Sequence, residues 1–400
     1  MTEISQKPGT SRVPRTDGQG KEITSPAHGK LSRRTALRGA GVGATSFLIV
    51  RSLSPLSYAQ AAASPSAIDA AIAYAQAHLP NSNAQIIKAA AKEGSLALTL
   101  QALGDDAYQA MIKKFNERYP FIRVSFTSQG AVPLLGKFNA ENASHRGIGD
   151  CFLLSSPHDG DVSRQNGAVS QFKISQDSAF PAAAKSSGYW YGWQLEFATT
   201  VFRLGALSSE ELRLIRSYQG LADPRFKGRL GAANVTTGTS AAQCYHLLHH
   251  TDQRVWKGLA ANKPMIKPGS PLLLDGLLRG EYDVALFMGE STAANAARGG
   301  APVGFVISSP AVTGYVTSVI AAAAPHPNAA KLWQDWALSK EGQDLWPTVS
   351  AAYSARTDVK TGPWYAAQPW FYNGSHVEID WNDFSAQKNN VIAQFNAAFK

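Results

Sequence analysis

One segment of the sequence combines the residue types that hold an anion. Thr236-Thr237-Gly238-Thr239-Ser240 follows the short apolar run 230–233 and precedes a helical pattern that begins at Ala241. A loop between a strand and a helix offers hydroxyl groups and the free backbone N–H groups of the first helical turn. A plain helix N-cap would use the same residue types and bind nothing. With capping as the alternative, we predict that the ligand contacts Thr237, Gly238, Thr239 and Ser240.

Polar residues also follow three predicted strands in the first half of the chain. The apolar runs 95–100, 122–126 and 150–154 are typical of strands. In an open α/β sheet, ligands bind at the carboxyl ends of the strands. We therefore predict further ligand contacts from the residues that follow these runs: Gln101, Ser128, Gln129, Ser155 and Ser156.

Aromatic and acidic side chains supply the remaining candidates. The segment 189–193 (Tyr-Trp-Tyr-Gly-Trp) is dense in rings that stack on a cation or a flat ligand, with core packing as the alternative. Glu290 follows the predicted strand 284–288 and offers a carboxylate to a cationic group, or simply a favourable charge at a helix start. Tyr189, Tyr191 and Glu290 therefore join the predicted ligand-binding residues.

Motifs of common enzymes and metal sites are absent from the sequence. The chain has no G-x-S-x-G, Walker A or G-x-G-x-x-G pattern, and no H-E-x-x-H or C-x-x-C pairing. His246 and His250 lie four residues apart on a predicted helix, which leaves a surface zinc site as an alternative. We expect no enzyme activity, no catalytic residue, no cofactor and no metal centre.

Strand and helix patterns alternate over most of the chain. Helical patterns at 105–118 and 132–142 separate the first three predicted strands, and strands at 230–233, 284–288 and 303–307 alternate with helices in the second half. A β-α-β series at this spacing builds a parallel sheet covered by helices. The sequence therefore predicts two α/β units whose loops position the candidate residues.

The first 61 residues have the order of an export signal. Ser32-Arg33-Arg34-Thr35-Ala36-Leu37-Arg38 is followed by an uncharged, moderately apolar stretch at 39–50 and by the small-x-small sequence Ala59-Gln60-Ala61. The pattern resembles the twin-arginine consensus, with Ala36 where Phe is usual. We predict that residues 1–61 are a signal peptide that is removed, and that the protein is exported already folded by the twin-arginine translocase.

The leader also explains most of the positive charge. The full chain carries a formal charge of +9, and residues 1–61 account for +6 of it. The remaining surface is nearly balanced, so it creates no long-range field for a polyanion. We therefore expect no nucleic-acid partner.

Three segments resemble a known family. They are 91–96 (Ala-Lys-Glu-Gly-Ser-Leu) with 115–120 (Phe-Asn-Glu-Arg-Tyr-Pro), then 220–229 (Gly-Leu-Ala-Asp-Pro-Arg-Phe-Lys-Gly-Arg), then 325–332 (Pro-His-Pro-Asn-Ala-Ala-Lys-Leu) with Trp336, Ser339, Glu341, Gly342 and Gln343. In order and spacing they resemble bacterial extracellular solute-binding proteins, in the branch with iron(III), 2-aminoethylphosphonate, thiamine and polyamine binders. Residues such as Asp223, Pro327 and Ser339 suit turns and helix starts, so we expect them to support the fold rather than the ligand.

The resemblance implies the type II periplasmic-binding-protein fold, an α/β architecture of two lobes joined by a two-segment hinge. The expected parts are 62–195 for the first portion of lobe 1 with N-terminal helices, 196–312 for lobe 2, and 313–400 for the return to lobe 1 and C-terminal helices. Cys151 and Cys244 would then lie in different lobes, and a bridge between them would lock the hinge. We therefore expect two free thiols.

The resemblance also implies a function. We expect a periplasmic, monomeric substrate-binding subunit of an ABC importer that captures a small polar solute, anionic or zwitterionic, and delivers it to a permease in the inner membrane. Ferric binders of this branch use two adjacent tyrosines, and this sequence has none. A binding protein that feeds a membrane sensor, a ferric-ion binder and an exported enzyme remain alternatives.

Overall fold

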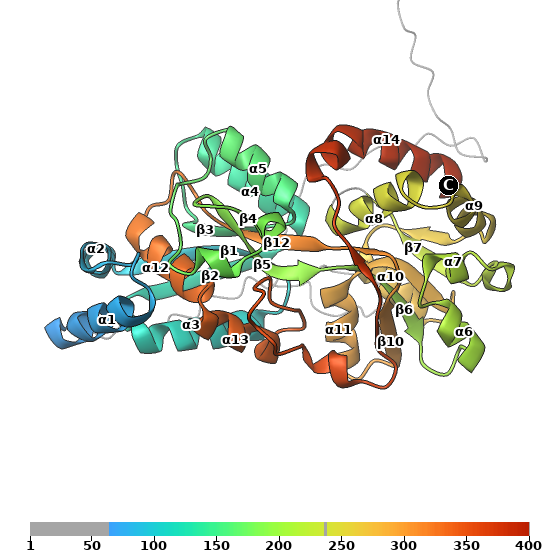
Figure 1. The fold of residues 1–400 in the computed structure, drawn as a ribbon, viewed down its shortest axis with the longest axis horizontal. Helices are drawn as coiled ribbons and strands as arrows, with labels where there is room; N and C mark the ends of the chain where they lie inside the picture. The colour runs from blue at the N-terminus through green and yellow to red at the C-terminus, as the bar shows by residue number, and fades with distance from the viewer. Residues whose placement is uncertain (1–63, 236–237, 400) are drawn as a thin grey trace, which may run out of the picture. The chain divides into compact units, whose positions relative to one another are not determined.

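A computed structural model of the chain describes residues 64–235 and 238–399. The predicted leader and Thr237 lie outside these residues. The described part contains two six-stranded mixed sheets, each covered by helices (Figure 1). This is the α/β class and the two-lobe, type II architecture that we expected.

The first sheet, which we call lobe 1, has the strand order β2-β1-β3-β12-β5-β4. Strands β1, β2 and β3 run parallel, while β12 is antiparallel to β3 and β5. The strands are β1 (Ser95–Gln101), β2 (Arg123–Gln129), β3 (Cys151–Leu154), β4 (Lys185–Ser186), β5 (Trp190–Glu196) and β12 (Gly314–Ile320). Its helices are α1 (Pro65–His78), α2 (Ala84–Glu93), α3 (Asp105–Arg118), α4 (Ala131–Ala143), α5 (Pro157–Gln165), α12 (Pro327–Ala337) and α13 (Lys340–Val349).

The second sheet, lobe 2, has the order β13-β10-β6-β9-β7-β8. Strands β8, β7 and β9 are parallel, and β6 is antiparallel to β9 and β10. The strands are β6 (Ala198–Arg203), β7 (Leu230–Ala233), β8 (Met265–Lys267), β9 (Val284–Gly289), β10 (Val303–Ile307) and β13 (Tyr372–Asn373). Its helices are α6 (Ser209–Leu214), α7 (Tyr218–Leu221), α8 (Gly238–His249), α9 (Gln253–Ala261), α10 (Ser270–Leu278) and α11 (Glu290–Arg298).

The chain passes between the sheets at three places. Only Phe197 separates β5 of lobe 1 from β6 of lobe 2, and residues 308–313 lead back from β10 to β12. After α13 the chain passes to lobe 2 again, where β13 pairs with β10 and α14 (Trp381–Phe399) packs on α8. Beside the crossings, β11 (Ala311–Val312) pairs with β14 (His376–Val377). The His376 ring lies 4.5 Å from that of Phe197, so the returning chain packs against the first crossing.

The residues that we assigned to fold support have that role. Ser339 caps α13, Pro327 opens α12, and the Asp223 side chain caps a short 3-10 helix at Pro224–Phe226. Gly94 ends α2 with φ +63°, a left-handed conformation that suits glycine. Glu93, beside it, binds the N-terminal turn of α12 and so joins the first and last of the three resembling segments.

Candidate functional site

A cavity of about 160 Å³ lies where the two lobes meet the first crossing. Lobe 1 contributes Gln101 at the end of β1, Ala131 at the start of α4, and Ser155 after β3. The crossing contributes Glu196 and Phe197. Lobe 2 contributes the remaining lining residues, Gly238, Thr239, Ser240, Ser270 and Gly289.

Helix N-termini surround this cavity. Helices α4, α10 and α11 have Gly130, Gly269 and Gly289 as N-caps, and none of these glycines supplies a side-chain hydrogen bond to the helix. Helix α8 begins at the cavity with Gly238. Each helix start carries a partial positive charge and backbone N–H groups without helical partners. The glycines leave the helix ends open, so the arrangement favours a negatively charged ligand group.

Gln101 adds a side-chain donor to this set. Only 6% of its surface is exposed, and its amide nitrogen has no hydrogen-bond partner among the described residues. Its backbone carbonyl accepts a hydrogen bond from the Tyr108 hydroxyl at 2.9 Å, which fixes the end of β1. Gln129 on β2 pairs with Gln101 in the strand register. The side-chain amide nitrogen of Gln129 also has no hydrogen-bond partner among the described residues. A buried amide donor is costly without an acceptor, so a ligand oxygen would satisfy it.

Glu196 is the acidic residue of the cavity lining, and the sequence analysis missed it. Its carboxylate has no hydrogen-bond donor among the residues described, and burial raises its pKa from 4.5 to about 7. The Oε1 atom lies 3.8 Å from the position that a Cβ would take on Gly289, which places it beside the start of α11. The sequence offered one signal for this residue: Glu196 is the single charged residue in the stretch 186–202.

The structure brings several predicted residues together. Gln101, Ser155, Gly238, Thr239 and Ser240 all line the cavity, as proposed from strand ends and from the Thr/Gly/Ser loop. Thr239 lies against Gly314: a Cβ atom on Gly314 would overlap the Thr239 hydroxyl. The start of α8 therefore packs directly on the return crossing.

Other predicted residues lie outside the cavity lining. The Ser128 hydroxyl donates to Asp105 at 2.6 Å, and Ser156 caps α5 through the Asp159 N–H. The Tyr189 ring lies 5.5 Å from the Arg164 guanidinium. The fully buried Tyr191 donates its hydroxyl to Asp177 at 2.9 Å, within the core of lobe 1.

Glu290 lies behind the cavity wall rather than in it. Only 1% of its surface is exposed, and it accepts a hydrogen bond from the Tyr365 hydroxyl. Burial, followed by the nearby charge of Glu196, raises the pKa of Glu290 well above its ordinary value. Glu290 therefore belongs to the buried support of the start of α11 and not to the cavity lining.

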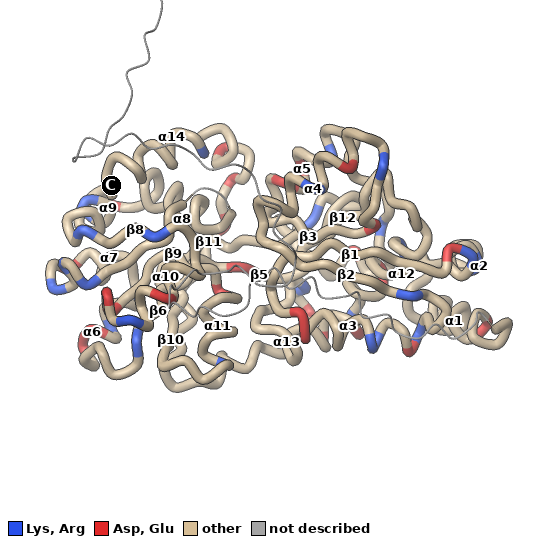
Figure 2. The backbone as a smooth tube through the Cα atoms, turned by 180° about the vertical axis from the view of Figure 1, so that it is seen from behind, with Lys and Arg blue, Asp and Glu red and all other residues tan. Residues whose placement is uncertain are grey.

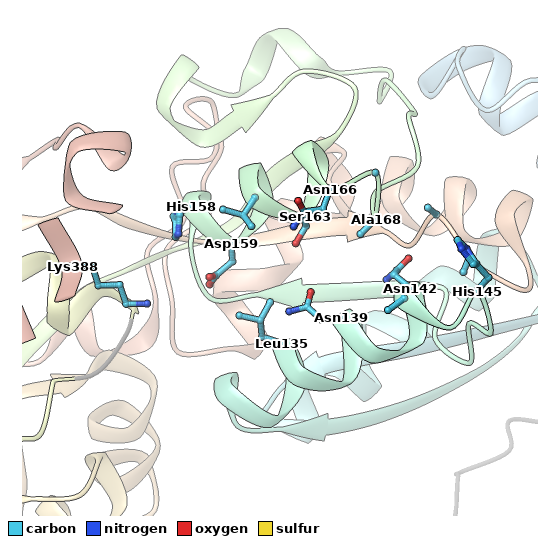
Figure 3. Close-up of a pocket in the computed structure, with 15 residues that line it drawn as sticks. Leu135, Asn139, Asn142, His145, His158, Asp159, Ser163, Asn166, Ala168 and Lys388 are labelled. Atoms are coloured by element: carbon cyan, nitrogen blue, oxygen red, sulfur yellow. The ribbon is translucent and has the colours of Figure 1, made fainter. Parts of the chain in front are cut away.

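A larger cavity of about 950 Å³ is lined by α4 and α5 of lobe 1 and reaches α14, the helix that packs on lobe 2 (Figure 3). Asn139, Asn142 and Asp159 point into it, and Lys388 of α14 lies at one end. This groove takes no residue from the crossings or from the sheet of lobe 2. The smaller cavity, by contrast, lies where the parallel strand ends, the helix starts and the first crossing converge.

The structure also bears on metals, thiols and membranes. Within residues 64–235 and 238–399 no group of His, Cys, Asp or Glu side chains is arranged to hold a metal ion. Cys151 on β3 and Cys244 on α8 are both buried and unbonded, which confirms the expected free thiols. None of the helices described has the length and hydropathy needed to cross a membrane.

Comparison with known proteins gives the family. The sequence model of the family described as bacterial extracellular solute-binding protein matches residues 98–347. No curated protein matches the sequence significantly.

Solved structures agree in fold. A substrate-binding protein of an ABC transporter from Agrobacterium tumefaciens has a TM-score of 0.62 at 16% identity, and the match covers 76% of this chain and 95% of that one. Iron-bound HitA from Pseudomonas aeruginosa scores 0.58 at 16% identity, covering 75% and 98%. AfuA from Actinobacillus pleuropneumoniae with fructose-6-phosphate scores 0.58 at 18%, covering 76% and 98%. With its two α/β lobes and the family match over most of both, this chain belongs to the bacterial extracellular solute-binding proteins.

Proposed function

We propose that the protein is the substrate-binding subunit of an ABC importer, and that it holds a small polar solute between its lobes for delivery to a membrane permease. The observation that supports this most directly is the cavity at the first crossing, lined by strand ends of lobe 1 and helix starts of lobe 2. A ligand there contacts both lobes, so it binds the closed arrangement more tightly and shifts the population toward it.

The contacts between the lobes suit a hinge. Phe197 alone joins β5 to β6, so a rotation at this residue moves one sheet against the other. Away from the crossings, Arg298 of α11 donates to the Ser350 carbonyl at 2.7 Å, and Asn295 of α11 donates to the Leu103 carbonyl at 3.4 Å. Such polar contacts can form and break as the lobes close and open.

Several finer assignments belong to this proposal. The ligand-binding residues are the predicted ones that line the cavity, together with Glu196 and Ser270. The protein acts as a monomer in the periplasm, and the twin-arginine translocase exports it. Delivery to a membrane sensor would use the same cavity. A ferric-ion binder is less well supported, since adjacent tyrosines are absent from the sequence and the described residues form no metal-ligand cluster.

Small-angle scattering with and without bound solute tests the mechanism. We expect a solute that stabilises the protein in thermal unfolding to reduce its radius of gyration as well. At a concentration one hundred times the dissociation constant, the stabilisation should be about 2.7 kcal/mol. A solute that binds without compaction would contradict capture by lobe closure.

A further inference from the structure

We infer that the outer edge of lobe 1 is a docking surface for an extended, acidic segment of a partner protein, which adds as a strand beside β2. This edge adjoins a cavity of about 550 Å³ on one face of β1 and β2. We call that cavity the edge trough; its lining includes Ser95, Thr99, Arg123, Thr127, Lys137 and Ile148. The edge trough shares no lining residue with the solute cavity, so the docking surface is separate from solute capture.

The free edge of β2 offers unused backbone groups. Among the described residues, β2 forms a ladder with β1 and with no other strand. The Arg123 N–H donates to the Gly94 carbonyl at 3.0 Å, at the start of that ladder. In a parallel pair, alternate residues bond to the same neighbour, so the odd-numbered residues of β2 face β1. The N–H and C=O groups that point to the open side, where an added strand can bond to them, belong to Val124, Phe126 and Ser128.

The face of the two strands beside this edge is polar. Side chains alternate along a strand, so the odd-numbered residues of β1 and β2 share one face. Their register pairs are Ser95 with Arg123, Ala97 with Ser125, and Thr99 with Thr127. The leucines of β1 point to the opposite face and pack in the core of lobe 1. Parallel strands are usually buried on both faces, so a trough floored with hydroxyl groups marks a surface that remains open to a partner.

The charge of the edge trough selects an acidic partner. Arg123 is exposed, and its guanidinium has no ion-pair partner among the residues described. Lys137 of α4 reaches over the floor, with its Nζ 3.2 Å from the Thr99 hydroxyl and 3.7 Å from a carboxylate oxygen of the buried Glu141. Neither β1 nor β2 contains Asp or Glu, and the acids of lobe 1 in Figure 2 lie on other elements. An acidic side chain of an added strand would therefore meet Arg123, while a basic one would be repelled.

The far wall of the edge trough is held in place by the fold. The Glu141 carboxylate accepts hydrogen bonds from the backbone N–H groups of Ile148 and Gly149, at 2.8 and 2.9 Å. Ile148 keeps 69% of its surface exposed in this position. An added strand beside β2 supplies the missing near wall. Because the far wall and the two strands are already ordered, the protein loses little conformational freedom when the partner docks.

Labelled peptides test the docking directly. The probe is Thr-Glu-Val-Glu-Val-Glu-Thr with blocked ends, and fluorescence anisotropy measures its binding to the purified protein. Two comparison peptides carry Gln or Lys at the Glu positions, and a third is the acidic peptide with an N-methyl group on every backbone nitrogen. We expect the acidic peptide to bind about ten times more tightly than the glutamine peptide, with the lysine and N-methylated peptides weaker still. Added salt should reduce the difference between the acidic and glutamine peptides.

Variants then assign the two contributions. Arg123→Gln should reduce the preference for Glu over Gln to about twofold, while Arg213→Gln, at an exposed arginine of α6, should leave it intact. Ser128→Pro removes an N–H group of the open edge without removing a bond to β1, and it should weaken the acidic peptide about tenfold. Ser128→Ala loses only the hydroxyl bond to Asp105 and should bind the peptide like the wild type. If Ser128→Pro fails to fold in thermal unfolding, the N-methylated peptide still tests the same backbone bonds.

Each outcome either supports or overturns the docked strand. No binding of the acidic peptide at about 1 mM would overturn it. So would equal binding of the acidic and lysine peptides, undiminished binding of the N-methylated peptide, or an unchanged preference in Arg123→Gln. Displacement of the peptide by inorganic phosphate, together with normal binding to Ser128→Pro, would show a small-anion site in its place. Solute binding and compaction should be the same in Arg123→Gln as in the wild type, so failure of the docking surface leaves the importer proposal standing.

Discussion

Glu196 makes the stability of the solute-free protein depend on pH. Burial raises its pKa from 4.5 to about 7, so the folded protein holds this proton more tightly than the unfolded chain does. The stabilisation from the protonated group is complete below pH 4.5 and is lost as the pH rises to 7. A shift of one pKa unit corresponds to about 1.36 kcal/mol. Because the accessible surface of Glu196 is intermediate and not that of a fully buried residue, solvent screening reduces the total to about 1–2 kcal/mol.

We therefore predict that the free energy of unfolding of Glu196→Gln increases relative to that of the wild type as the pH rises from 4.5 to 8. Glutamine keeps the shape of the side chain but carries no charge at either pH. Urea unfolding of both solute-free proteins at the two pH values measures the difference. Glu210→Gln is the control: Glu210 is exposed on α6 and pairs with Arg225 at 3.0 Å, so removing its charge should bring no such gain. A Glu196→Gln effect that is equal at both pH values would contradict a buried, titrating carboxylate.

At the scale of the elements, Glu93 connects two segments that lie far apart in the sequence. Glu93 ends α2, and its carboxylate accepts hydrogen bonds from the backbone N–H groups of Asn328 and Ala329, at 3.1 and 2.8 Å. It also accepts one from the Asn328 side chain at 2.7 Å. A negative charge at a helix N-terminus satisfies free N–H groups and complements the helix dipole. Helices α2 and α12 are thereby held together.

We predict that Glu93→Ala lowers the free energy of unfolding by about 1–3 kcal/mol, because charged hydrogen bonds to the helix start are lost. Lys92→Ala, at the exposed neighbouring position, should change it by less than about 0.5 kcal/mol. Urea midpoints of the two variants give the comparison. Neither substitution touches the cavity, so solute affinity should be unchanged. A large loss of affinity in Glu93→Ala would contradict a purely structural role.

The fold was predictable where local signals were strong, and the site only in part. Helix α2 shows its N-cap Asn83 and its terminal Gly94 in the sequence, and strands such as β1 show their apolar run. The position of Glu196 depends on the approach of α11 from almost one hundred residues away, which no local pattern records. Tyr191 and Trp193 share one face of β5 because strand side chains alternate, and that face is the core of lobe 1. Ring content alone did not reveal which face the ligand would meet.

At the scale of the whole molecule, the free thiols and the predicted leader fit one route. Cys151 and Cys244 are buried and unbonded, and burial raises the pKa of both thiols well above the ordinary value. The fold therefore needs no oxidising compartment to form a disulfide. A protein that folds in the reducing cytoplasm and is exported already folded meets no redox obstacle, which is the order of events that a twin-arginine signal requires.

We predict that replacing Arg33 and Arg34 together by lysine retains the precursor in the cytoplasm. The substitution preserves the charge of the leader, so a route that reads only positive charge would continue to export the protein. A route that recognises the two guanidinium groups themselves would no longer export it. Replacing Arg12 and Arg15 by lysine, in the polar stretch before the pair, is the matched control and should leave export intact. Cell fractionation followed by detection of precursor and mature forms gives the result. Mature protein in the periplasm with both arginines replaced would refute the assigned route, while the solute cavity and the lobes around it would stand unchanged.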